Sequence, residues 1–290
     1  MLMRRTAVCD RGRLSLLLVF MVFISTTLNS TVFTNSQEDF ASNVTGSHLD
    51  KSKGGPISDS SLPRFQSAID AEWFGAAFEA FDEMTKRIES LPLDDITSQR
   101  LKRVCFVHSS TLSKNNANIL EEMLVIIHHA GLLSELDALW VLNYGFQVPQ
   151  HIKKFKPFAN ITWVEMGPSA SLFEVPTLEV LRRFSMKAVK ASPDLQVLYV
   201  HTKGASYTRR FEGIEHWRNM MMYFLVEEHR ACYHLLASDA FDILGVNRYL
   251  RMFSGNFWWA RASYIATLRP FNENDKKYDS EYWILTGIHI

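Results

Sequence analysis

The sequence predicts an α/β fold with a mostly parallel sheet and helices on both of its faces. Three observations predict it. Short apolar segments of strand length alternate with longer segments of helical periodicity from Arg100 onward. Hydrophobic residues make up 47% of the 290 residues, with only 13 Gly and 9 Pro, which excludes a disordered or collagen-like chain. Three Cys are too few for a disulfide scaffold or a multi-cysteine zinc module.

Before this domain, the chain divides into parts that predict a membrane-anchored protein. Residues 1–13 contain four arginines and are expected to form a cytosolic tail. Residues 14–28 carry no charge and are interpreted as a short signal-anchor that places the body in the lumen; a cleaved signal peptide or a transit peptide is the alternative. Residues 29–63 are rich in small polar residues and are expected to form a flexible stem.

An amphipathic helix is predicted over residues 64–90. Its apolar side chains recur at spacings of three and four, and its opposite face is acidic. The apolar positions are Phe65, Ile69, Trp73, Ala77, Phe81, Met84 and Ile88. Such a helix either packs on the main domain or joins two copies into a homodimer through the stem.

Two further features agree with a lumenal body. Asn29, Asn43 and Asn160 each begin an Asn-X-Ser/Thr glycosylation sequon. Cys105 and Cys232 either pair in an oxidising lumen or stay as buried thiols. We favour buried thiols, because both cysteines lie inside apolar segments.

The domain spans residues 100–290, and its elements are expected in the following order. Strands are predicted at 104–108, 138–143, 161–165, 196–201 and 241–246. Helices are predicted at 118–133, where Asn118 and Glu121 resemble a capping box, and at 177–191 and 217–236. The segment 257–268 reads as either strand or helix. In a mostly parallel sheet, ligands gather at the carboxyl ends of the strands.

The most informative strand end follows residues 196–201. There an apolar strand runs directly into His201, Thr202, Lys203 and Gly204, which bring an imidazole, a hydroxyl and an ammonium together before a glycine. These groups suit an anionic ligand. The next helix begins near Trp217 and Arg218; a helix start favours anions, and a guanidinium suits phosphate oxygens.

Two later segments complete the candidate site. Ser254, Gly255 and Asn256 form a turn before adjacent tryptophans, of which one is expected to point inward and one outward if the segment is extended. Trp258 and the turn suit sugar recognition, with core packing as the alternative for at least one indole. Glu281 is a candidate general base, a metal ligand or a surface charge.

Other motifs are absent from the sequence. It contains no phosphate-cradling G-x-x-x-x-G-K-[ST] loop and no G-x-G-x-x-G, H-E-x-x-H or G-x-S-x-G. It also lacks an acidic D-x-D, for which residues 273–275 are the nearest substitute. The 31 basic and 31 acidic residues balance, which argues against a nucleic-acid binder. Residues 100–290 carry 22 Lys+Arg against 18 Asp+Glu, a net charge of +4 that suits an anionic small molecule.

Together these motifs resemble a known group. The matching segments are VLYVHTKGAS (197–206), HWRNMMMYFLVEEHRACYHLL (216–236), FDILGVN (241–247), FSGNFWWARASYIATL (253–268) and SEYWI (280–284). They resemble an uncharacterised glycosyltransferase-like family found in algae, protists and plants, which is distantly similar to bacterial polysaccharide-synthesis proteins. The resemblance implies a GT-A-like nucleotide-diphospho-sugar transferase fold.

The resemblance also implies roles for the candidate residues. The segment from His201 to Gly204, with Arg218, would hold the donor diphosphate. Trp217, the turn 254–256 and Trp258 would face the acceptor sugar. His201 or Glu281 would act as the base.

The sequence therefore predicts a Golgi-type lumenal glycosyltransferase that uses a nucleotide-sugar donor and a glycan or glycoprotein acceptor. A requirement for Mn²⁺ or Mg²⁺ stays open, because the D-x-D is missing. A non-catalytic carbohydrate- or nucleotide-sugar-binding module is the alternative. A sulfotransferase is disfavoured by the lack of a phosphate-cradling loop.

Overall fold

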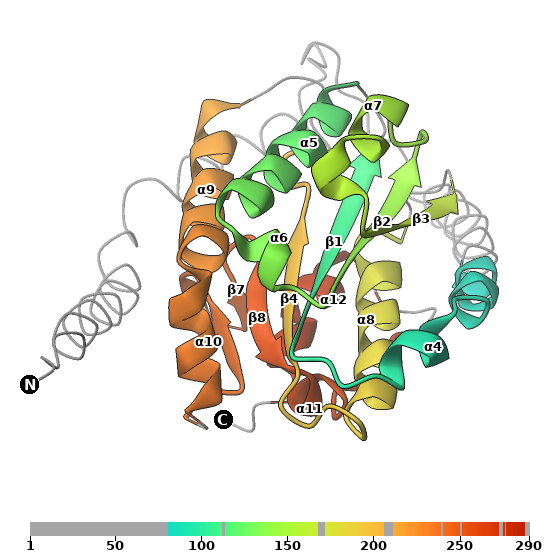
Figure 1. The fold of residues 1–290 in the computed structure, drawn as a ribbon, viewed down its shortest axis with the longest axis vertical. Helices are drawn as coiled ribbons and strands as arrows, with labels where there is room; N and C mark the ends of the chain where they lie inside the picture. The colour runs from blue at the N-terminus through green and yellow to red at the C-terminus, as the bar shows by residue number, and fades with distance from the viewer. Residues whose placement is uncertain are drawn as a thin grey trace, which may run out of the picture. The chain divides into compact units, whose positions relative to one another are not determined.

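The computed structural model describes residues 81–111, 114–167, 172–205, 211–238, 240–249, 251–272, 275 and 277–287. They form a six-stranded sheet with helices on both faces, so the predicted α/β class is confirmed (Figure 1). The predicted tail, signal-anchor and stem, and residues 64–80 of the predicted amphipathic helix, lie outside the described residues. Within the described part, no helix has both the length and the apolar character needed to cross a bilayer.

The sheet is mostly parallel, as predicted. Its strands are β1 (Arg103–Thr111), β2 (Ala138–Gly145), β3 (Ile161–Gly167), β4 (Gln196–His201), β5 (Ile243–Gly245) and β8 (Trp258–Arg261). They are ordered β3-β2-β1-β4-β8-β5, and β1 to β4 run parallel. Only β8 in this sheet is reversed, because it pairs antiparallel with both β4 and β5. A short hairpin of β6 (Arg248–Tyr249) and β7 (Met252–Phe253) lies between β5 and β8 in the chain.

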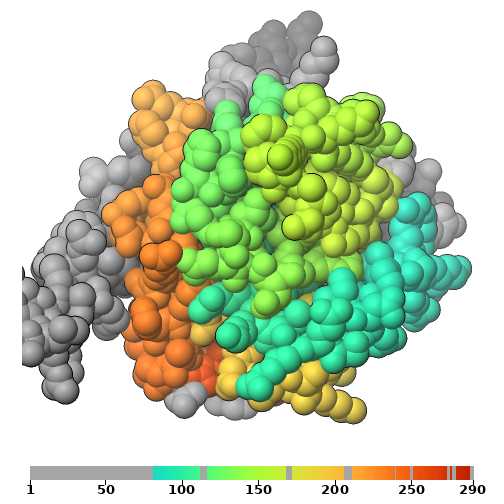
Figure 2. Space-filling model, in the orientation of Figure 1, coloured from blue at the N-terminus to red at the C-terminus, as the bar shows by residue number. Residues whose placement is uncertain are grey.

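Helices cover the sheet in two layers. One layer contains α4 (Leu93–Thr97), α8 (Val175–Ala188), α11 (Ala262–Ile265), α12 (Lys277–Tyr282) and η3 (Trp283–Leu285). The other contains α5 (Lys114–His129), α6 (Leu132–Glu135), α7 (Gln150–Lys153), η1 (Lys156–Phe158), α9 (Glu212–Met222), η2 (Tyr223–Glu227) and α10 (His229–Ala237). Figure 2 shows the outer surface of this second layer, with α5, α6 and α7 in greens.

Alternate strand residues enter two separate cores. In β1, Val104 and Phe106 pack under α8, whereas Cys105 and Val107 pack under α5. Since both faces are covered, the strands read as unbroken apolar runs. Burial on both faces also corrects the expectation that one of the two adjacent indoles points outward. Trp258 and Trp259 lie on opposite faces of the sheet, and both are fully buried, so neither indole points to solvent.

Several helix boundaries in the structure differ from the predicted ones. α5 begins at Lys114, one turn before Asn118, so Asn118 is not the cap; the polar first turn gave no apolar periodicity to detect. The same helix ends before Gly131, whose φ of 77° starts the separate helix α6. The undecided segment 257–268 contains both elements, since β8 is followed directly by α11.

The predicted long helix 217–236 is interrupted. It consists of α9, the π-helical turn η2 and α10. The wider turn directs the Leu225 carbonyl sideways, where it accepts a hydrogen bond of 2.7 Å from the Trp259 indole Nε1–H. A buried indole on β8 thus ties the π-helical turn to the sheet.

The described end of the amphipathic helix, residues 81–89, packs on the domain. Met84 and Ile88 are buried in the core beneath α8. The Arg87 Nη1 donates to the Glu165 carbonyl at 3.2 Å, and Glu89 lies 3.7 Å from Arg183. Packing on the main domain, one of the two expected alternatives, therefore holds for these residues.

Both described cysteines are free. Cys105 lies in β1 and Cys232 in α10, and both are fully buried. The expected pair of buried thiols is confirmed, and the alternative disulfide is wrong. Burial raises the pKa of both thiols well above the ordinary range, which keeps them protonated and unreactive.

Candidate functional site

The polar strand ends converge where the strand order changes direction. From β1 the chain moves outward to β2 and β3, and it then returns to the other side of β1 as β4. The carboxyl ends of β1 and β4 are therefore the switch point of the sheet, the place where open α/β sheets bind ligands. His108 of β1 and His201 of β4 are direct neighbours there. We call this region the carboxyl-edge site.

The loop after β4 is fixed to β1. The Thr202 N–H donates to the His108 carbonyl at 3.0 Å, and the Thr202 Oγ1 accepts from the Ser110 N–H at 3.1 Å. Thr202 is buried, so its hydroxyl holds the strand ends together. Gly204 follows with a φ of 93°, a conformation that glycine adopts without strain. The predicted H-T-K-G segment is therefore a rigid exit from β4.

Glu174 joins three parts of this site. It is the N-cap residue of α8, and its side chain is 13% exposed. Its Oε2 accepts hydrogen bonds from the Tyr199 hydroxyl at 3.0 Å and from the Asn256 Nδ2 at 2.5 Å. Its Oε1 faces the His201 Nδ1 at 3.5 Å. The carboxylate thus connects β4 with the turn before β8.

Each ring nitrogen of His201 faces a protein group. Its Nε2 lies 2.8 Å from the Gly255 carbonyl, which only accepts, so Nε2 carries a hydrogen and donates it. Its Nδ1 faces Glu174, and the ring is 7% exposed. Such a histidine positions the turn 254–256 rather than facing a bound ligand.

Burial and neighbouring charges shift the pKa values of His108, His201 and Glu174. Burial lowers the pKa of His108 to about 4, and the nearby His201 adds to this, while Glu174 opposes it. Burial also lowers the pKa of His201, with help from Lys203 and against the pull of Glu174. For Glu174, burial alone would raise the pKa, but His201, His108, Lys203 and the Asn256 amide outweigh it and lower the pKa. Glu174 is accordingly a buried anion at neutral pH.

The turn 254–256 requires its glycine. Gly255 has a φ of 81°, and an added Cβ would lie only 2.4 Å from the Met221 Sδ on α9. Asn256 also has a positive φ, of 55°. Its Oδ1 accepts from the Trp258 Nε1–H at 3.1 Å, and its Nδ2 reaches the Ser280 carbonyl at 3.3 Å. Ser254 is buried, and its Oγ has no hydrogen-bond partner among the residues that the structure describes.

Trp258 lies below this turn in the core. Its ring stacks on Tyr199 with centroids 5.1 Å apart, and it is fully buried. The turn that was expected to face an acceptor is thus held by its own tryptophan and by Glu174.

Lys203 lies at the same edge, beside an indole ring. Its Nζ lies 4.9 Å from the centroid of the Trp217 ring, and it forms no ion pair among the described residues. Trp217 is half-buried at this place. Arg218, by contrast, is 4% exposed; its Nη1 donates to the Lys203 carbonyl at 3.0 Å and its Nη2 lies 3.4 Å from Glu122. The guanidinium therefore holds the backbone of Lys203 in place.

Glu281 is brought to the same edge. It lies on α12, directly after Ser280, and its side chain is half-buried. The charges of Glu174 and Glu281 both raise the pKa of the Tyr199 phenol, after the larger effect of burial. Of these two carboxylates, Glu174 accepts the hydrogen bond of the Tyr199 hydroxyl.

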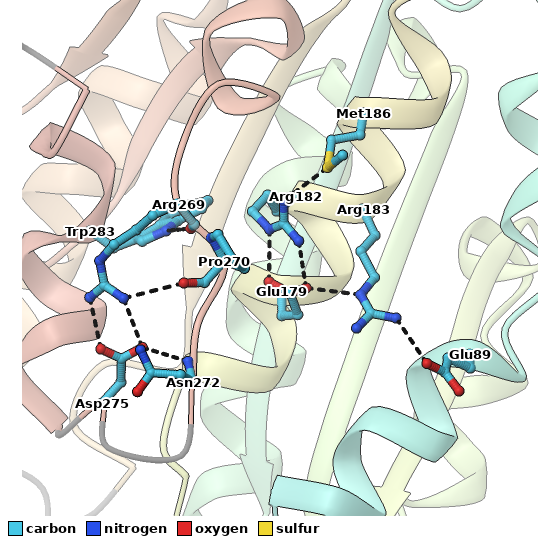
Figure 3. Close-up of polar contacts among 10 residues, drawn as sticks. All are labelled: Glu89, Glu179, Arg182, Arg183, Met186, Arg269, Pro270, Asn272, Asp275 and Trp283. Carbon is cyan, nitrogen blue, oxygen red and sulfur yellow. Dashed lines mark hydrogen bonds and ion pairs between the residues drawn. The ribbon is translucent and has the colours of Figure 1, made fainter.

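The described residues contain no group of three or more His, Cys, Asp or Glu side chains that could hold a metal ion. In the nearest substitute for a D-x-D, residues 273 and 274 lie outside the described part, and Asp275 binds both Nη atoms of Arg269 at 2.9 and 2.8 Å (Figure 3). The same carboxylate accepts from the Asn272 N–H at 2.8 Å, so its role here is to hold the loop after α11.

Sequence reasoning missed two members of the site. His108 was assigned only to a strand, although it is the register partner of His201. Glu174 was not singled out, although Pro176 in the first turn of α8 marks a helix start and hence its N-cap. The remaining candidates, from His201 to Gly204, Trp217, Arg218, the turn 254–256 and Glu281, do meet at one end of the sheet.

Fold and site together define an α/β domain with a polar, mixed-charge edge at the switch point of a mostly parallel sheet. The chain belongs to the family DUF8361, described as a domain of unknown function, whose family model matches residues 104–286. The match spans every strand of the sheet apart from the first residue of β1. A comparison with curated proteins gave no match.

Proposed function

We propose that this protein is a type II membrane-anchored glycosyltransferase of the secretory pathway, with a GT-A-like domain in the Golgi lumen. It would transfer a sugar from a nucleotide-sugar to a glycan or glycoprotein acceptor. One observation carries the proposal: Lys203, an unpaired cation among the described residues, follows β4 at the switch point of the sheet. The order β3-β2-β1-β4-β8-β5, with β8 reversed, supports the GT-A-like assignment.

Lys203 would act on the leaving group. In sugar transfer the bond between the anomeric carbon and the diphosphate oxygen breaks, and negative charge develops on the departing nucleoside diphosphate. A fixed ammonium beside that oxygen stabilises the developing charge more than the ground state, which accelerates the reaction. The positive φ of Gly204 turns the chain immediately after Lys203.

Glu281, on α12 at this edge of the sheet, would be the base for the acceptor. The acceptor hydroxyl oxygen forms the new bond to the anomeric carbon, and its proton passes to the carboxylate. The Glu174 carboxylate already accepts two hydrogen bonds and faces His201, so it is less suited to this role. His201 and Arg218 are positioning residues in this scheme, since each contacts a backbone carbonyl of the site. No step is assigned to Mn²⁺ or Mg²⁺.

The test measures donor binding and turnover separately. Purified full-length protein is screened by thermal shift against a panel of nucleotide-sugars, with and without Mn²⁺, and hydrolysis or transfer is then measured for the donors that bind. Lys203→Ala should lower kcat at least 100-fold, about 3 kcal/mol of transition-state stabilisation. Lys203→Arg should retain part of the activity. Lys190→Ala, which removes an exposed lysine that precedes β4 in the sequence, serves as the control.

A second variant tests the base. Glu281→Gln should lower kcat while the thermal shift with donor stays unchanged, because the carboxylate acts on the acceptor and not on the diphosphate. Unchanged turnover in both Lys203→Ala and Glu281→Gln would refute the proposed roles. Protease protection of the domain in microsomes tests the lumenal address, and full digestion would refute it.

One observation favours the alternative, a non-catalytic nucleotide-sugar- or carbohydrate-binding module. The buried polar groups of the site, Glu174 and His201, are already satisfied by protein partners, as in a site that binds without reacting. Donor or glycan binding without hydrolysis or transfer across the whole panel would support this second function.

A further inference from the structure

The sequon at Asn160 lies in a place that the proposed activity does not use. Asn160 is exposed in the turn between η1 and β3, and Thr162, the third residue of the sequon, is the second residue of β3. The Asn160 side chain forms no hydrogen bond with the described part of the chain, so its amide nitrogen is accessible. The other two sequons, at Asn29 and Asn43, lie outside the described residues.

The turn sits far from the carboxyl-edge site. Asn160 precedes the amino end of β3, whereas the candidate site lies at the carboxyl ends of the parallel strands. The seven residues of β3, at about 3.3 Å each, separate the two ends by about 20 Å. A bulky group on Asn160 would therefore leave the candidate site open. It would also stand at the start of β3, one of the two edge strands of the sheet.

A surface hollow adjoins the asparagine. It has a volume of about 360 Å³, lies at the amino end of β2 and includes Asn160 in its lining. Pro157, Leu133 and Leu136 contribute apolar surface, and His128 and Ser134 contribute polar groups. Apolar surface suits the C–H face of a sugar ring, and the polar groups suit its hydroxyl and acetamido substituents.

We propose that Asn160 carries an N-linked glycan whose innermost N-acetylglucosamine rests against this hollow. The modification forms a bond between the Asn160 amide nitrogen and the anomeric carbon of an oligosaccharide. The bond from that carbon to a lipid diphosphate breaks, the lipid diphosphate leaves, and the amide proton is lost. The co-reactant is a lipid-diphosphate-linked oligosaccharide of the secretory pathway. The inference rests on the lumenal address in the proposed function, but not on catalysis.

The first experiment asks whether the site is used. The full chain is expressed in a eukaryotic secretory host with Asn29→Gln and Asn43→Gln, so that Asn160 is the one remaining sequon. A shift of one glycan on gels, removed by peptide N-glycosidase, is expected. It should vanish in Asn160→Gln and in Thr162→Ala, and it should persist in Thr162→Ser, which keeps the sequon. Mass spectrometry of the unmutated protein gives the same answer without relying on the folding of any variant.

The second experiment tests whether the innermost N-acetylglucosamine contacts the hollow. Trimming with an endoglycosidase that leaves one N-acetylglucosamine should keep the Tm of the glycosylated protein, whereas complete removal should lower it by about 2–4 °C. Because complete removal converts Asn160 to aspartate, Asn160→Asp is the matched control and should show the same lower Tm.

The outcomes separate this inference from the proposed enzyme. An unmodified Asn160 overturns the inference, whether or not turnover of a nucleotide-sugar is detected. Equal Tm values for the intact, trimmed and bare forms overturn the contact with the hollow. A glycan at Asn160 in a protein without transferase activity supports the inference. The same result contradicts only the proposed catalytic function.

Discussion

Acidification should destabilise the protein through His108. Its folded pKa is lowered from 6.5 to about 4 because the ring is buried at the end of β1. Between these two values the unfolded chain binds a proton that the folded chain does not, so stability rises with pH and is lost as the pH falls. With about 1.4 kcal/mol for each tenfold difference in proton affinity, acidification from about pH 7.5 to about pH 5 should cost about 2 kcal/mol through this residue.

The variant His108→Asn isolates this contribution. An asparagine places an amide near the Nδ1 position, which lies 2.9 Å from the Thr177 hydroxyl, and it does not titrate. The variant loses the ring contact with Tyr144, whose centroid is 5.2 Å away, so it should be less stable at neutral pH. When the pH is lowered, the free energy of unfolding of the variant should nevertheless fall by about 2 kcal/mol less than that of the wild type.

The assay is urea unfolding followed by tryptophan fluorescence at several pH values, with linear extrapolation to water. His234→Asn, which changes an exposed histidine on α10, is the control and should keep the wild-type pH dependence. His201 and Glu174, whose charges act on the pKa of His108, remain in every variant. An equal acid-induced loss in His108→Asn and wild type would refute the reasoning.

The remaining predictions concern single buried contacts and are read from the same unfolding assay. Trp259→Phe removes the hydrogen bond from the indole to the Leu225 carbonyl of the π-helical turn and should cost about 0.5–1.5 kcal/mol beyond packing. Trp140→Phe should cost less, because the Trp140 Nε1 has no hydrogen-bond partner in the described part of the chain; equal losses would contradict the assignment. Gly255→Ala should destabilise more than Gly131→Ala. Both glycines have positive φ, but only the new Cβ at Gly255 meets another side chain, while nothing lies within 4 Å at Gly131.

The strands were predictable because of how they are buried. β4 was predicted with its observed bounds, and the cores of β1, β2 and β3 were found, because a strand covered on both faces is an unbroken apolar run. Helix starts were harder to place. α5 opens with polar residues and α9 with Glu212, so apolar periodicity begins one turn or more inside each helix.

The site was predictable only in part, for a geometric reason. His201 to Gly204 follow a strand, so their position at the carboxyl edge could be inferred from one local pattern. Glu174 acts through contacts with Tyr199 and Asn256, which come from other elements, and no local pattern records such a meeting. The π-helical turn η2 was missed for the same reason, because its partner Trp259 lies 34 residues further along the chain.

The placement of the tryptophans gives the protein an internal optical reporter. Four of them, Trp140, Trp258, Trp259 and Trp283, are fully buried, and their emission should be blue-shifted and shielded from acrylamide. Trp217 is half-buried directly beside the Lys203 ammonium, so an anion that binds there should alter its emission. With Trp163→Phe removing the other half-buried indole of the described part, a quenching titration would follow occupancy of the carboxyl-edge site without any added label.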